Sequence, residues 1–438
     1  MKEMPAPNAE YSSNNMWDLM AELFPVYRAL CGPGFLKSLE IIQKHLSLDI
    51  KKFPSGQKVF DWTIPKEFDV NKAYVEGPDG KRYLDFDDCN YHVWLYSKSF
   101  KGEMDREELI KNIATMPEYP DSVPLRNAYY RDLWGLSGSV HQIQNLPEGR
   151  YKVNIDTEHY DGFLRIGEYY LPGETKDEIM ITSYLCHPMG ANDNLSGVVL
   201  SVELFKLLAQ LSKRRYSYRL LIWPETIGSV TYIANFPDRI KNVVGGYVVT
   251  CVGDGGDFTY KRSFNGDSLI DRAAIHALKH SEHTFKDVSY RHDSGSDECR
   301  FNSVGLRLPF GSIMRTMYGH FPQYHSSEDN LSFVQKKCLY ESLKIYWSTL
   351  MTLERAVTYK GKFIVDPFLT KHGIHPWDQG TTGGNLGSAV GSAYYHLMGG
   401  VDGKSDLLEI ADKAGEPITV FDRAVEDFLR TGLMEKVN

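Results

Sequence analysis

EIMITSYLCHPMGANDNLSG, residues 178–197, is the stretch of this chain that decides its fold. Residues 179–186 have the length and the β-branched character of a buried strand, and Pro188 stops it because proline cannot donate to a sheet. His187 therefore lies at the end of a strand. Asp193 follows in a short turn, and residues 195–211 then repeat apolar side chains at helical spacing. Strand, loop and helix form a βα unit, whose loop carries the ligand site in open α/β sheets.

The same alternation continues along the chain. Strands are expected at 219–223, 243–250 and 306–313, with helices at 267–280 and 335–357, and two amphipathic helices, 16–30 and 35–46, precede them all. Strands that alternate with helices indicate βαβ units. The predicted fold class is therefore α/β, with a mixed or largely parallel sheet flanked by helices.

A different pattern interrupts this domain. Between about residue 60 and residue 170, short alternating runs such as 81–86 and 162–171 lie between turn sequences. Because helices precede this region and the βα units follow it, we expect a small β-rich domain, 61–170, inserted into an α/β domain that comprises 1–60 and 171–358.

The last segment, 359–438, is predicted to be a linker followed by a winged-helix domain. The Gly-rich run 380–391 has no following Lys-Ser/Thr and no strand before it, so a phosphate-binding role is not expected. Helices are expected at 405–413 and 419–430, with a short strand at 433–437. Residues 402–438 carry nine Asp/Glu and five Lys/Arg. This acidic balance favours packing or protein contact over DNA binding.

Composition sets broad limits on the whole protein. A chain of 438 residues with 42% hydrophobic and 24% charged residues is typical of a folded soluble protein of two or three domains. The net charge of −8 argues against nucleic acid as a partner. The sequence has no signal-peptide core and no membrane-spanning run, so we expect a cytoplasmic protein, with self-association left open. The six scattered cysteines are expected to be free thiols.

Three further polar features follow predicted strands of the α/β domain. Glu225 comes directly after the strand 219–223, Asp297 and Glu298 stand in SGSDECRF, and His325 stands in QYHSSEDN. Imidazole and carboxylate are ligands of zinc in hydrolytic sites, where an open position holds water. Zinc lowers the pKa of that water to about 7, and a neighbouring carboxylate can take its proton. Isolated histidines elsewhere are expected to be surface or core residues: His141, His159 and His396.

The strings CHPMGANDNLSG, PETIGS, GSDE and YHSSEDNLSFV resemble the successive motifs of zinc-dependent aminopeptidases related to bacterial leucine aminopeptidase and glutamate carboxypeptidase. More closely, nearly the whole chain resembles bacterial proteins with an aminopeptidase-like domain. In that group a small β domain interrupts the catalytic domain and a winged helix follows it. The resemblance implies His187, Asp193 and His325 as metal ligands and Glu225 as the general base.

Two departures from the family pattern affect the expected metal content. Thr226 follows Glu225 where the family has a second glutamate, and Thr250 or Cys251 stands where the family has an aspartate ligand. One zinc ion is therefore expected in preference to two. Asp254 or Asp257 is an alternative source of the missing ligand. Glu225 itself could instead be a ligand, or a carboxylate that favours a helix N-terminus.

The remaining charged candidates concern the substrate. Asp297 and Glu298 could orient a ligand or bind a substrate ammonium group, or form a surface pair; Arg300, Arg307 and Arg315 could bind a carboxylate or make structural ion pairs. The predicted function is a zinc-dependent aminopeptidase or amide hydrolase that acts on a small peptide or amide. The alternatives are a metal-retaining binding or scaffold protein and, disfavoured by the acidic tail, a transcription regulator.

Overall fold

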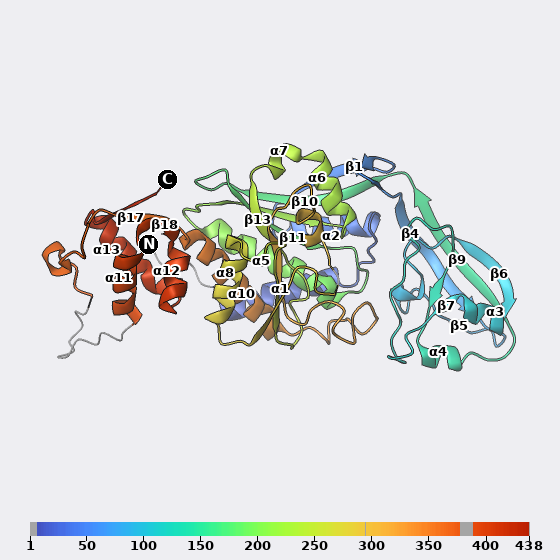
Figure 1. The fold of residues 1–438 in the computed structure, drawn as a ribbon. Helices are drawn as coiled ribbons and strands as arrows, with labels where there is room; N and C mark the ends of the chain where they lie inside the picture. The colour runs from blue at the N-terminus through green and yellow to red at the C-terminus, as the bar shows by residue number, and fades with distance from the viewer. Residues whose placement is uncertain (1–6, 294, 377–388, 438) are drawn as a thin grey trace.

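The structure is a computed structural model that describes residues 7–293, 295–376 and 389–437. Figure 1 shows three parts along its length: a central α/β body, a β-rich lobe at one end and a small C-terminal unit at the other. The candidate site residues predicted from the sequence all belong to the central body.

The central body is built on an eight-stranded sheet with the order β1-β10-β12-β11-β13-β16-β14-β15. The strands β12, β11, β13 and β16 are parallel neighbours. β10 runs antiparallel to β1 and β12, and β14 runs antiparallel to β16 but parallel to β15. In sheet order the bounds are β1 Asp49–Pro54, β10 Phe163–Leu171, β12 Ser217–Trp223, β11 Glu178–Tyr184, β13 Val243–Val248, β16 Phe310–Met314, β14 Phe258–Lys261 and β15 Phe285–Val288. The predicted mixed sheet is confirmed.

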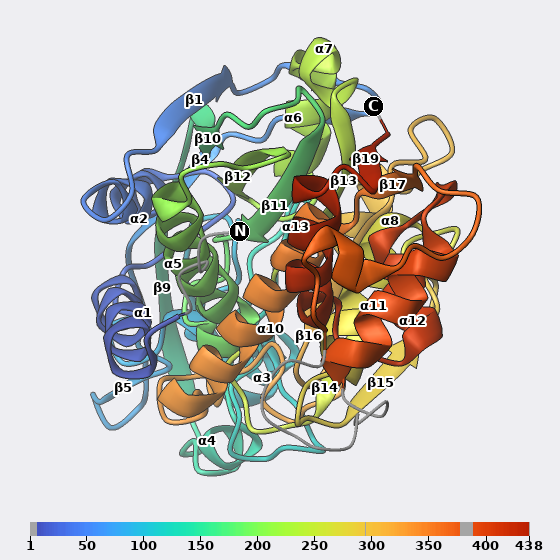
Figure 2. The same ribbon diagram turned by 90° about the vertical axis from the view of Figure 1, so that its left-hand side faces the viewer.

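Helices flank this sheet. Figure 2 shows α1, α5 and α10 side by side, and α8 packs against α10. The bounds are α1 Ala9–Leu23, α2 Pro33–Gln43, α5 Gly197–Gln210, α6 Ile227–Asn235, α7 Pro237–Ile240, α8 Leu269–Lys279, α9 Glu298–Phe301 and α10 Lys336–Arg355. Every residue of β11 and β12 is buried, as expected for central strands covered on both faces.

The first helix differs from its prediction. We expected it at 16–30, but α1 begins at Ala9, where the Asn8 side chain accepts a hydrogen bond from the backbone N–H of Tyr11. It ends at Leu23, because Pro25 has no backbone N–H with which to continue the helical hydrogen bonds. The apolar pattern continues past this proline, so the predicted helix began and ended seven residues too far along the chain.

The β-rich part, which we call the β lobe (residues 67–160), is built on a four-stranded sheet with the order β5-β4-β9-β6. Its elements are β4 Glu67–Glu76, β5 Arg82–Tyr83, η1 Asn90–His92, β6 Phe100–Asp105, α3 Arg106–Lys111, β7 Ile113–Ala114, β8 Leu136–Ser137, α4 Val140–Gln144 and β9 Arg150–Tyr160; the hairpin β2 Lys58–Val59 and β3 Trp62–Thr63 precedes it. The chain leaves the large sheet after β1 and returns to it with β10, which pairs with β1.

One predicted boundary of the inserted segment is wrong. We expected residues 163–170 in the inserted β-rich domain, but they belong to β10, which pairs with β1 and β12 of the large sheet. The turn 161–162 joins β9 directly to β10, so the two strands have the sequence pattern of one hairpin although they lie in different sheets. The sequence therefore carries no local signal of the change from one sheet to the other.

The C-terminal unit has a three-stranded sheet, β18-β17-β19, and three α-helices within its described residues. The bounds are β17 Thr358–Gly361, η3 Leu369–His372, α11 Ala389–Gly400, β18 Asp402–Asp406, α12 Leu407–Ala414, η4 Ile418–Phe421, α13 Asp422–Arg430 and β19 Met434–Lys436. Ion pairs join it to the body, among them Arg272 with Asp406 at 2.5 Å and Arg355 with Asp422 at 2.8 Å. The winged-helix assignment stays a prediction. Most of the Gly-rich run, residues 380–388, lies outside the described residues.

Two smaller expectations can be compared with the structure. All six cysteines are free thiols, as predicted, and none is among the exposed residues. Within the described ranges, no helix combines the length and the apolar character that a bilayer crossing requires.

A buried ion network joins three strands of the large sheet. Arg219 of β12 contacts Glu178 of β11 at 2.7 Å and also pairs with Glu168 of β10, and each side chain is less than 10% exposed. Arg239 gives Glu168 a second cation at 2.6 Å. We expect Arg219→Ala to lower the free energy of unfolding by about 3–5 kcal/mol, because Glu178 loses its cationic partner inside the protein. Urea denaturation measures this loss.

Arg150→Ala is the matched control for this prediction. Arg150 of β9 is 65% exposed, and its ion pairs with Glu103 and Asp105 span 3.8–3.9 Å. Its removal is expected to cost less than about 1 kcal/mol. Equal losses in the two variants would show that the buried network does not stabilise the sheet.

Candidate metal centre

The carboxyl ends of β11 and β12 bring the first two site residues together. These strands are parallel neighbours whose last residues, Tyr184 and Trp223, face each other in register. The chain continues from β11 to His187 and from β12 to Glu225 within three residues of the strand ends. The His187 Nε2 atom consequently lies 4.0 Å from Glu225 Oε2.

Asp193 is held in a fully buried turn, residues Ala191–Ser196, just before α5. The backbone N–H groups of Asn192 and Asp193 donate to the two carboxylate oxygens of Asp329 at 2.6 and 2.8 Å. The peptide bond between Asp193 and Asn194 is cis. Asp329 thus fixes the turn, a role that the sequence did not indicate although its motif contained the residue.

His325 completes the group from a loop far along the chain. Its Nε2 atom lies 3.2 Å from Asp193 Oδ2, and its ring centroid lies 5.1 Å from that of His187. His187, Asp193 and His325 each offer a ligand atom, and the three atoms lie within 4.8 Å of one another. The structure therefore brings together the three residues that the sequence predicted as metal ligands.

The polar atoms of this group fit a cation. His187 Nδ1, Asp193 Oδ2 and His325 Nε2 are all buried and make no hydrogen bond. Buried polar atoms without a partner are costly, and three of them on residues whose ligand atoms lie within 4.8 Å of one another are explained by an ion that takes lone pairs from this group. Two imidazoles and a carboxylate are a zinc ligand set that leaves a position open for water.

The protonation states of the group also suit a metal. Burial lowers the pKa of His187 to about 4, so its imidazole is neutral at pH 7. Burial acts to raise the pKa of Asp193, but His187, His325 and the Tyr184 hydroxyl outweigh it and bring that pKa to about 2. A neutral imidazole and an ionised carboxylate are the forms that bind metal ions.

The second oxygen of Asp193 is already occupied. The Tyr184 hydroxyl donates to Asp193 Oδ1 at 2.5 Å and lies 2.7 Å from Thr250 Oγ1. Thr250 follows β13, where the resemblance called for an aspartate ligand. A tyrosine and a threonine hydroxyl thus stand beside Asp193 where a second carboxylate was expected.

The two alternative aspartate ligands lie outside the group. Asp254 accepts hydrogen bonds from the Asn192 side chain at 3.0 Å and from Thr316 Oγ1 at 2.6 Å. Asp257 accepts from Thr284 Oγ1 at 2.7 Å. Neither takes the place of the missing ligand.

Glu225 lies in a tight turn between β12 and α6. Thr226 has φ 63° and ψ −65°, and the N–H of Ile227 donates to the carbonyl of Glu225 at 2.7 Å, which defines a strained γ-turn. Ser296 Oγ donates to Glu225 Oε1 at 2.5 Å. Burial, with the nearby carboxylates of Asp193 and Asp297, raises the pKa of Glu225 to about 8. The Glu225 carboxylate contacts Ser296 and His187, and it does not cap the N-terminus of α6.

Asp297 and Glu298 are buried, so the expectation of a surface pair is wrong. Asp297 accepts hydrogen bonds from the Thr226 N–H at 2.8 Å, the Trp223 indole at 2.9 Å and the Ser229 hydroxyl. These bonds hold the strained turn that presents Glu225. Glu298 pairs with the fully buried Lys261 at 3.0 Å. Neither carboxylate is free to bind a substrate.

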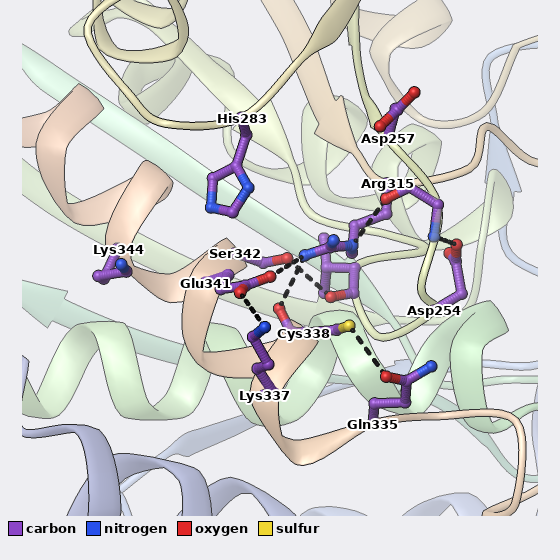
Figure 3. Close-up of polar contacts among 12 residues, drawn as sticks. Asp254, Asp257, His283, Arg315, Gln335, Lys337, Cys338, Glu341, Ser342 and Lys344 are labelled. Carbon is purple, nitrogen blue, oxygen red and sulfur yellow. Dashed lines mark hydrogen bonds and ion pairs between the residues drawn. The ribbon is translucent and has the colours of Figure 1, made fainter.

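The three candidate arginines are also engaged elsewhere. Arg315 donates to Glu341 at 3.0 Å and to the carbonyl of Gly256 at 3.1 Å, as Figure 3 shows beside α10. Arg300 lies over the Trp62 ring at 5.8 Å, and Arg307 lies over the Phe264 ring at 3.6 Å. Arg315 therefore forms a structural ion pair with Glu341.

A cavity of about 280 Å³ opens beside the site. The central body, the hairpin β2–β3 and the β lobe all contribute to its wall, which is lined by Leu30, Trp62, Leu95, Leu125, Asn127, Tyr129, Tyr130, Cys186, His187, Glu225, Thr226, Ile227 and His325. No sequence pattern predicts that residues of the hairpin and the lobe line this cavity, because only the tertiary fold brings them to the site.

The β lobe also contacts the backbone of a candidate ligand. The N–H of Leu125 donates to the carbonyl of His325 at 2.8 Å, and Pro124 pairs with Ser326 as an isolated bridge. The N–H of Val123 donates to Ser327 Oγ at 3.1 Å. His325 itself has a positive φ of 53°, a strained conformation that these contacts stabilise.

A second group of possible ligands lies on the surface of the body. His292, Asp293 and His320 offer ligand atoms within 4.8 Å of one another, and all three are exposed. His320 Nε2 already lies 2.5 Å from Asp293 Oδ2. This exposed group is useful as a control for measurements of metal binding at His187, Asp193 and His325.

Comparisons with known proteins give relatives for nearly the whole chain. Residues 17–356 match a family described as "Domain of unknown function (DUF4910)". A protein of Clostridium acetobutylicum, named "Putative polysaccharide biosynthesis protein with aminopeptidase-like domain", is 39% identical over 433 residues, which cover 98% of each chain.

Solved structures show the same fold. A crystal structure from Clostridium acetobutylicum, described as that of a "putative peptidase", is 38% identical, covers 98% of each chain and superposes with a TM-score of 0.91. BSAP, a zinc aminopeptidase from Bacillus subtilis, superposes with a TM-score of 0.59 at 14% identity, over 80% of this chain and 96% of that one. This second likeness concerns the fold alone.

Proposed function

Since the chain belongs to the DUF4910 family and has the aminopeptidase-like fold, we propose that it is a zinc-dependent hydrolase of a peptide or other amide bond. One observation carries the proposal: His187, Asp193 and His325 converge with unpartnered buried atoms beside a carboxylate, Glu225, at a cavity. Ligands that leave an open position, with an acid–base group next to them, are the parts that amide hydrolysis needs.

The residues divide into two roles. His187, Asp193 and His325 would hold the ion, which when bound polarises a carbonyl and lowers the pKa of a water molecule. A cation beside Glu225 also favours its ionised form. In that form Oε2, the oxygen that faces His187, takes a proton from the attacking water, and Glu225 returns it to the leaving nitrogen. Ser296 orients the other oxygen of Glu225, and Asp297 holds the turn that presents it.

The site favours one ion over two. A two-metal centre uses the bridging carboxylate through both oxygens, but the Tyr184 hydroxyl donates to Asp193 Oδ1. Thr250, beside the same hydroxyl, offers no carboxylate. The Tyr184 hydroxyl leaves Asp193 Oδ2 as the oxygen available to a single ion, which this residue would hold together with His187 and His325.

A second candidate function is a metal-retaining binding protein without turnover. The same two departures, Thr226 in place of a second glutamate and Thr250 in place of an aspartate, favour it, because they remove groups on which the two-metal enzymes rely. Only a measurement of turnover separates the two candidates.

Metal removal tests the proposal. We expect the purified chain to bind one zinc ion at the buried group, to hydrolyse an amide substrate, and to lose that activity on chelation and regain it with added zinc. Zinc content and hydrolysis of a panel of peptides and acyl amides are measured before and after chelation. A His320→Ala variant accounts for any ion at the exposed group. A zinc-loaded chain that hydrolyses nothing in the panel would support the binding protein instead.

A further inference from the structure

The cavity beside the candidate metal centre has a nearly uncharged wall. Among the described residues that line it, the only carboxylate is Glu225 and the only imidazoles are His187 and His325. These are the proposed base and two of the proposed ligands. The other lining residues are apolar or neutral, and none of them is a lysine, arginine or aspartate.

The charged groups that could have served a charged substrate are engaged elsewhere. Asp297 and Glu298, the sequence's candidates for binding an ammonium group, are completely buried and bonded to the protein. Arg315, a candidate for a carboxylate, pairs with Glu341 beside α10 (Figure 3). Neither Arg300 nor Arg307 lines the cavity.

This distribution of charge has a consequence for an aminopeptidase substrate. The free α-ammonium group of such a substrate lies next to the bond that is cut, so it would enter this cavity beside Glu225 and the two imidazoles and lose part of its water. A charge that loses water without gaining a partner of its own is destabilised. Glu225 cannot serve as that partner and also act as the proton carrier of the reaction.

We propose that the acyl side of the substrate is uncharged, so that this chain hydrolyses an N-acylated amine and not a peptide with a free N-terminus. The inference rests on the proposed hydrolase function and narrows its substrate class. The reaction is R–CO–NH–R′ + H₂O → R–COOH + H₂N–R′, in which R has no ammonium group. The carbon–nitrogen bond breaks, a carbon–oxygen bond forms, and the proton of the water passes through Glu225 to the leaving nitrogen.

The size and chemistry of the wall agree with a small neutral acyl group. The volume of about 280 Å³ is near the lower end of the roughly 300–1,000 Å³ of small-molecule sites. The rings of Trp62, Tyr129 and Tyr130 supply apolar surface with polar edges. Asn127 adds an uncharged side chain that can both donate and accept hydrogen bonds.

A matched pair of substrates tests the inference on the zinc-loaded full chain. Leucyl p-nitroanilide and 4-methylpentanoyl p-nitroanilide have the same carbon skeleton and differ in the α-ammonium group. We expect kcat/KM to be at least about tenfold higher for 4-methylpentanoyl p-nitroanilide, since a penalty of 1.4 kcal/mol corresponds to tenfold. Equal or faster hydrolysis of the leucyl compound would overturn the inference while leaving the hydrolase function intact. No hydrolysis of either compound, or of the wider amide panel, would refute the proposed function itself.

An added charge in the cavity provides the second test. Asn127→Asp places a carboxylate on the wall with little change in size, and Asn127→Ser removes the amide without adding charge. We expect Asn127→Asp to shift the ratio of the two kcat/KM values at least about tenfold toward the leucyl compound, and Asn127→Ser to leave the ratio near that of the native chain. A ratio that does not move in Asn127→Asp, or that moves equally in both variants, would contradict the placement of the acyl group in this cavity.

Discussion

Replacement of Glu225 by glutamine is expected to lower kcat by about 10² to 10⁴-fold while the chain keeps its zinc. Glutamine has the size of glutamate, and its oxygen can still accept the hydrogen bond from Ser296 Oγ. It cannot take a proton from water, so the reaction loses its proton carrier but the ligands His187, Asp193 and His325 remain. Steady-state kinetics and zinc analysis of the same preparations measure the two effects.

Asp257→Asn is the control for this variant. Asp257 is an exposed carboxylate bonded to Thr284, away from the candidate ligands, so its amide is expected to keep both zinc and kcat. Loss of zinc from Glu225→Gln would reassign Glu225 as a ligand. An unchanged kcat in Glu225→Gln would remove it from the mechanism.

Alanine at either His187 or His325 is expected to weaken zinc binding by at least about 100-fold, and activity should fall with it. Each substitution removes one of three protein ligands whose atoms converge within 4.8 Å. Each imidazole also favours the ionised form of the buried Asp193, so either substitution is expected to lower the free energy of unfolding of the metal-free chain as well. Urea denaturation of the metal-free variants and the metal-free native chain separates this loss of stability from the loss of zinc affinity.

His320→Ala separates this result from binding at the surface. His320 belongs to the exposed group with His292 and Asp293, and its loss should leave the zinc of the buried group and the activity unchanged. If zinc were lost from His320→Ala but retained by His187→Ala and His325→Ala, the ion would belong to the surface group, and the candidate centre would be wrong.

The sequence predicted the central fold well because its strands carry two local signals at once. The strands β11 and β12 are buried throughout and rich in apolar residues, as is typical of strands covered on both faces, and a proline follows each of them in the sequence. The identity of a strand's pairing partner leaves no such local signal. Residues 163–170 were therefore expected in the inserted β-rich domain, although they belong to β10, which pairs with β12.

The candidate site likewise has residues that the sequence predicted and residues that it did not. His187, Asp193, Glu225 and His325 stand in short motifs at strand ends or loops, and the resemblance gave them their roles. The groups that position them come from remote segments: Tyr184 faces Asp193, Ser296 orients Glu225, and Asp329 fixes the turn of Asp193. The partner of a buried polar side chain depends on tertiary packing, so one sequence cannot identify it.

The backbone bonds between the β lobe and the loop of His325 bear on how this protein can vary. The carbonyl of His325 is held by Leu125, and the next residue bridges to Pro124. A chain cut back to its α/β portion would therefore lack these main-chain contacts to the loop of His325, the third candidate ligand. The lobe is part of what holds the candidate site together, although it supplies none of the three candidate ligands.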